Sequence, residues 1–98
     1  MINDFDSVVE TAIKLYEEKI GQFATRTWQM IERYGKIDAL SRLVVSADLQ
    51  SGFKVLRDNG LLEYTFEAIV VKYKDKFKPN IVEAAQWRIE EANRLLKK

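Results

Sequence analysis

The segment 61–73, LLEYTFEAIVVKY, is the most apolar part of the chain and most limits how the chain can fold. Large apolar side chains recur along it at the spacing of one helix face, and Phe77 continues that face. They are Leu62, Phe66, Ile69, Val70 and Tyr73. A second apolar set on the opposite side consists of Leu61, Tyr64, Ala68 and Val71. A helix that is apolar on two sides is either buried between other helices or part of an interface.

The same segment is rich in β-branched residues, which favour strands. We therefore compared the two periodicities. Alternation from Tyr64 onward gives neither side a clean apolar face, so the helical period fits this segment better than the strand period.

Apolar periodicity predicts helices over the rest of the chain as well. We expect them at about residues 4–20, 23–34, 47–59 and 79–96, with a shorter helix whose inward residues are Ala39, Leu40, Leu43 and Val44. No repeat or long linker interrupts this pattern. The prediction is an all-α fold, in which residues 1–98 form a single helical domain, a compact bundle of five to six short helices.

The ends of these helices carry recognisable signals. Asp38 and Ser46 are suited to N-caps, and Gly35 and Gly60 to the positions just after helices. Pro79 is expected in the first turn of the last helix, where its fixed backbone angle is tolerated.

One stretch resembles a different fold. Residues 55–63, VLRDNGLLE, are similar to the end of the recognition helix in winged helix-turn-helix domains. The resemblance implies that residues 63–76 form a β wing in place of a helix. The short turn that normally precedes a recognition helix is missing.

This alternative implies a DNA-binding surface on the helix 47–59 and on the lysine-rich segment 72–78, KYKDKFK. Lysines interleaved with aromatic residues can follow phosphates and stack bases. The other interpretation is that Tyr73 and Phe77 belong to the core and the lysines form a solvated helix end. The candidate nucleic-acid contacts are Gln50, Ser51, Lys54, Arg57, Lys72, Lys74, Lys76 and Lys78.

Trp87 is predicted to lie on the charged side of the last helix. At about 100° per residue it points away from the apolar face, and its neighbours on that side are Asn80, Glu83, Glu90 and Arg94. Tryptophan is enriched at interface hot spots. Either a partner or another part of the chain is expected to cover it. Trp28 lies nearer the apolar side of its helix and is expected in the core.

The composition excludes several kinds of chemistry. The chain has no cysteine and no histidine, so it has no disulfides, thiolate zinc sites or serine–histidine triads. Glu63 and Glu67, like Asp4 and Asp6, are close enough to share Mg²⁺ or act as an acid–base pair, but no convergent group accompanies them. We expect these acids to be solvated, and we expect no catalytic residue, cofactor, metal site or small-molecule substrate.

The charge and hydropathy patterns bear on location. Lysine and arginine number 16 against 15 acids, a net of +1, which is less basic than is usual for a nucleic-acid-binding domain. No apolar run approaches the roughly 20 residues of a membrane span. The acidic start, MINDFDSVVE, does not resemble a secretory signal. We expect a soluble, cytoplasmic protein that does not bind membranes.

These observations favour a small non-enzymatic helical protein-interaction module. Its candidate interface residues are Leu61, Tyr64, Ala68, Val71 and Trp87. The partner is either a second copy of the chain, giving a homodimer, or a separate protein. The alternative is a helix-turn-helix-like DNA-binding domain.

Overall fold

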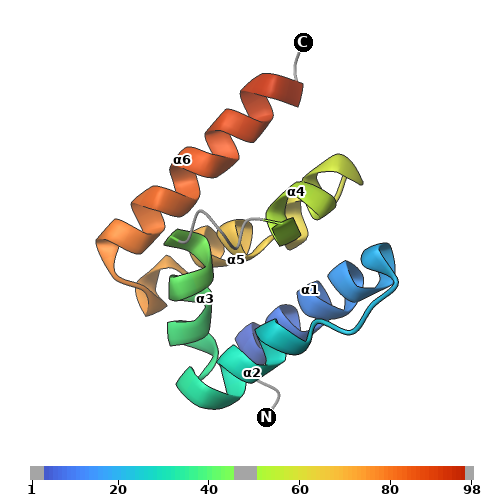
Figure 1. The fold of residues 1–98 in the computed structure, drawn as a ribbon. Helices are drawn as coiled ribbons and strands as arrows, with labels where there is room; N and C mark the ends of the chain where they lie inside the picture. Colours follow the sequence, from blue (N-terminus) through green and yellow to red (C-terminus); the bar gives the residue numbers. More distant parts are fainter. Residues whose placement is uncertain (1–3, 46–50, 97–98) are drawn as a thin grey trace.

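The computed structural model describes residues 4–45 and 51–96, which form six α-helices, two short 3-10 helices and no strand (Figure 1). In chain order these are α1 (Asp4–Ile20), α2 (Thr25–Tyr34), α3 (Lys36–Val45), α4 (Ser51–Asp58), η2 (Leu62–Tyr64), α5 (Phe66–Lys72), η3 (Lys74–Lys76) and α6 (Pro79–Leu96). The predicted all-α bundle is confirmed. The winged alternative is wrong, because η2, α5 and η3 occupy the segment that was to form the wing.

Most helix limits agree with the sequence signals. α1 has the predicted limits, and α6 begins at Pro79. α2 begins later than predicted, because Ala24 has a non-helical backbone (φ −82°, ψ 64°). α3 begins at Lys36, so Asp38 lies in its first turn and is not its N-cap. The predicted cap Ser46 and the start of the predicted helix 47–59 lie outside the described residues.

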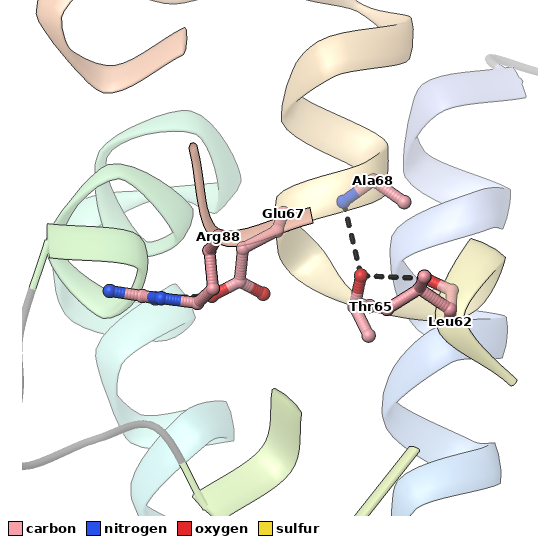
Figure 2. A network of polar contacts seen from close by, with 5 residues as sticks. All are labelled: Leu62, Thr65, Glu67, Ala68 and Arg88. Atoms are coloured by element: carbon pink, nitrogen blue, oxygen red, sulfur yellow. Dashed lines mark hydrogen bonds and ion pairs between the residues drawn. The ribbon is translucent and has the colours of Figure 1, made fainter. Parts of the chain in front are cut away.

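The periodicity predicted one continuous helix over the most apolar segment, 61–73. The structure instead divides this segment into η2 and α5. The backbone is extended at Thr65 (φ −73°, ψ 156°), between η2 and α5. The Thr65 hydroxyl accepts a hydrogen bond from the Ala68 N–H (3.1 Å) and donates one to the Leu62 carbonyl (2.7 Å), as Figure 2 shows. One buried hydroxyl therefore caps α5 and closes the turn before it.

Replacing Thr65 with valine keeps the shape of this side chain and removes both hydrogen bonds. We expect the free energy of unfolding to fall by about 1–2 kcal/mol, the cost of losing an N-cap at a buried site. Urea denaturation measures this. Thr11→Val, on the exposed side of α1, is the matched control and should change stability by no more than about 0.5 kcal/mol. Equal effects of the two substitutions would show that the cap does not stabilise the fold.

The core lies where α1, α3, α5 and α6 meet (Figure 1). Its largest fully buried aliphatic side chains are Val9, Ile13, Leu40, Val44, Ile69 and Val70. The four inward residues predicted for α3 are all buried, which confirms that prediction. α6 packs against both α5 and α3 through the face that carries Ile81, Ala85 and Ala92.

An aromatic cluster joins the start of α1 to the segment after α5. The ring of Phe5 makes edge contacts with Tyr73 (5.3 Å between centroids, 74° between planes) and with Phe77 (6.0 Å, 61°). Phe5 and Phe77 are buried, and Tyr73 packs partly buried against the core. The interpretation of Tyr73 and Phe77 as core residues is confirmed.

Candidate functional site

The outer face of α6 carries the most exposed tryptophan. Trp87 is 62% exposed, and Glu83 and Glu90 on the same side are also exposed. Arg94 donates to the carboxylate of Glu91 one turn earlier. Within the described residues, no other helix encloses Trp87.

The other four predicted interface residues do not form one helix face with each other. Leu61 and Tyr64 precede the break at Thr65, whereas Ala68 and Val71 lie on α5 after it. All four are half-buried, and Val71 packs against the core. Trp87 lies on the side of α6 away from its buried residues. The structure therefore does not join the five predicted residues into one surface.

The lysines of the segment 72–78 are exposed, whereas its aromatic residues Tyr73 and Phe77 are half-buried and buried. Lys54 and the four lysines of segment 72–78 are all exposed. Lys76 lies over the ring of Phe5, with Nζ 5.5 Å from the centroid. Arg57 is half-buried and paired with Asp58 (2.9 Å). Gln50 lies outside the described residues, and the side chain of Ser51 is not described. The prediction that Phe77 stacks on bases is wrong, because its ring is buried in the core.

A buried ion pair that no sequence pattern had indicated links α5 to α6. Glu67 is 4% exposed, although it was expected to be solvated. The guanidinium of Arg88 donates to Glu67 Oε2 (the two side chains lie together in Figure 2). Burial raises the pKa of the Glu67 carboxyl, while the hydrogen bond and the charge of Arg88 act in the opposite direction. Glu63 is exposed, as expected.

Glu67 also borders a cavity of about 450 Å³. The cavity lies among α1, the segment 20–27, α3, α4 and α5. Its apolar wall includes Ile13, Tyr16, Phe53, Leu56 and Phe66. No sequence pattern had indicated this cavity, because residues from five separate parts of the chain form it.

The connection between α1 and α2 forms part of the cavity wall. Glu17 Oε2 accepts hydrogen bonds from the Ala24 N–H (2.8 Å) and from Trp28 Nε1 (2.9 Å). Phe23 borders the cavity, is 68% exposed and stacks on Trp28 (6.4 Å between centroids, 18° between planes). Trp28 is half-buried against the core, near where it was predicted. Glu17 thus fixes the backbone and the indole beside the cavity.

Within the described ranges, no cluster of three or more acidic side chains is placed to bind a metal ion. In the same ranges, every helix is too short or too polar to cross a membrane. Comparison of the chain with protein families, curated proteins and solved structures finds no match.

Proposed function

We propose that this chain is a small non-enzymatic protein-interaction module that binds a separate protein through the outer face of α6. The observation that carries the proposal is the 62% exposure of Trp87 in an 18-residue helix. An indole offers a large apolar area and one N–H donor, and tryptophan is enriched among residues that dominate binding energy. Covering this side chain would remove apolar surface from water.

The charges around Trp87 favour a particular kind of partner. Glu83 and Glu90 are exposed on the same side of α6, and the one base there, Arg94, is paired with Glu91. Two copies of this face would bring like charges together, which opposes self-association. The complementary partner has an apolar pocket for the indole, flanked by lysine or arginine.

DNA binding by α4 and the segment 72–78 is the weaker candidate. It is supported by the exposed lysines. Two features oppose it. The segment predicted to form a β wing consists of η2, α5 and η3, and the ring of Phe77, which was expected to stack on bases, is buried.

Site-specific crosslinking tests the proposal. A photoreactive residue is placed at Gln86, exposed beside Trp87, and in a second protein at Lys54, exposed on α4. We expect a crosslinked partner from position 86 and not from position 54. With that partner purified, Trp87→Ala should weaken binding by about 30-fold, the scale of a hot-spot residue.

The control is Val45→Ala, which shortens an exposed apolar side chain of α3 and should leave the affinity unchanged. Circular dichroism confirms that both variants are folded. Identical crosslinking from both positions would contradict the proposal. A dimer in sedimentation experiments that Trp87→Ala dissociates would replace the separate partner by a second copy of the chain.

A further inference from the structure

The cavity beside Glu67 opens to solvent along the segment 22–26, where Gln22, Phe23, Thr25 and Arg26 are exposed. This cavity measures about 450 Å³, within the range of roughly 300–1,000 Å³ found for small-molecule sites. Its size is that of a small-molecule site.

One side of the cavity suits an apolar body, whereas the segment 22–27 contributes the polar residues Gln22, Thr25, Arg26 and Thr27. Phe53 and Leu56 of α4 face it from one element, and Ile13 of α1 and Phe66 of α5 from two others. Aromatic and aliphatic side chains therefore border it from three helices. A ligand enclosed by them gains binding energy in proportion to its apolar surface.

The buried carboxylate of Glu67, which borders the cavity, favours an uncharged ligand that donates a hydrogen bond. The Glu67 carboxylate already has a cationic partner in Arg88, so the pair carries no net charge. At this buried end of the cavity, a charged ligand would lose its hydration without meeting an unpaired opposite charge. Arg26, the other charged residue that borders the cavity, is exposed. A carboxylate accepts several hydrogen bonds, and Arg88 supplies one to Oε2.

The geometry points to this cavity as a binding site for a small, uncharged, largely aromatic or aliphatic molecule whose single hydroxyl or N–H donor reaches Glu67. This goes beyond the interaction surface on α6, which involves different residues. It also revises the sequence-based expectation that the chain binds no small molecule.

The segment between α1 and α2 provides a reporter for this site. Phe23 borders the cavity and stacks on Trp28, so the indole of Trp28 lies close to any occupant. The chain has two tryptophans. In a Trp87→Phe variant, Trp28 is the only one, and energy transfer from it reports binding at the cavity.

The test uses two fluorescent probes with the same aromatic framework, titrated into the Trp87→Phe protein. N-phenyl-1-naphthylamine is uncharged and has one N–H donor. Anilinonaphthalene sulfonate adds a negative charge. We expect a saturable rise in the fluorescence of the uncharged probe with energy transfer from Trp28. We expect the sulfonated probe to bind at least about tenfold more weakly, because it must bury its charge.

Substitutions that fill the cavity test whether the probe binds there or elsewhere on the protein surface. Ala12 is buried and borders the cavity, so Ala12→Leu should weaken the uncharged probe at least about tenfold. Thr11→Leu makes a similar change on the exposed side of α1 and should leave binding unchanged. If Ala12→Leu does not fold, Thr27→Phe fills the cavity from α2.

Three results would overturn the inference. The first is no saturable signal from the uncharged probe with folded protein. The second is equal affinity for the sulfonated probe, which would show that the site does not prefer an uncharged molecule. The third is unchanged binding in a folded cavity-filling variant, which would place the probe elsewhere on the surface.

Discussion

Replacing Arg88 with methionine is expected to lower the free energy of unfolding by about 3–5 kcal/mol at neutral pH. The side chains of Arg88 and Glu67 are only 13% and 5% exposed, so the substitution leaves a carboxylate buried without its cation. Methionine keeps most of the apolar volume of the arginine side chain, which limits the packing loss. Urea denaturation at neutral pH measures the change.

This loss is expected to shrink in acid. Burial raises the pKa of the Glu67 carboxyl above its ordinary value of 4.5, and Arg88 opposes that rise. Removing Arg88 therefore raises this pKa further. A carboxyl with a raised folded-state pKa stabilises the fold most below its unfolded pKa, and this stability is lost as the pH rises through the folded pKa. The variant should thus lose stability from pH 4.5 upward more steeply than the wild type.

Two controls isolate the ion pair. The double variant Glu67→Met/Arg88→Met removes both charges and should recover most of the lost stability, because apolar replacement of a buried pair is often neutral. Arg94→Met breaks the exposed pair with Glu91 and should cost no more than about 1 kcal/mol. Equal losses in Arg88→Met and Arg94→Met would mean that burial of the Glu67 pair has no energetic consequence.

Replacing Phe5 with alanine is expected to lower the free energy of unfolding by about 3–5 kcal/mol, the usual cost of removing a buried ring. Phe5 is buried and makes edge contacts with Tyr73 and Phe77. The substitution leaves a cavity between the start of α1 and the segment after α5, and it removes both ring contacts. Thermal or urea denaturation measures the loss.

Phe23→Ala removes the same side chain from a site that is 68% exposed. It should therefore cost no more than about 1 kcal/mol, mainly from the lost stacking on Trp28. If the two alanine variants were equally stable, the aromatic cluster around Phe5 would not hold α1 in place.

The helices with clear end signals were predictable from the sequence. α1 combines an apolar stripe with acids at its start and Gly21 after its end, and α6 has Pro79 at its first position. These signals depend on neighbouring residues only, so periodicity and capping chemistry suffice to read them. The periodicity also predicted that Trp87 lies on the side of α6 away from its buried residues, although it left open whether another part of the chain covers the ring.

The break at Thr65 was missed, although a signal was present. The apolar spacing continues across η2 and α5, so periodicity alone does not reveal two elements. Threonine was counted there as a β-branched residue, but it is also a preferred N-cap. Its hydrogen bond to the Ala68 N–H is the bond expected of a cap.

The ion pair and the cavity could not be read from spacing. Glu67 and Arg88 are separated by 21 residues and become neighbours only when α6 packs on α5. A partial signal exists for Arg88, which lies at the edge of the apolar face of α6, whereas Glu67 lies between the two apolar sets of the segment 61–73. The cavity depends on how five parts of the chain fit together, and local sequence does not encode the space between them.

The packing of α6 has a consequence for folding during synthesis. The ribosome makes α1 to α5 before α6, and α6 covers parts of both α3 and α5. Until α6 is available, the nascent chain exposes that apolar surface, and Glu67 lacks the guanidinium that neutralises it. The earlier helices are therefore expected to remain loosely packed on the ribosome, and the stable fold forms only after Arg88 and Ala92 have left the exit tunnel.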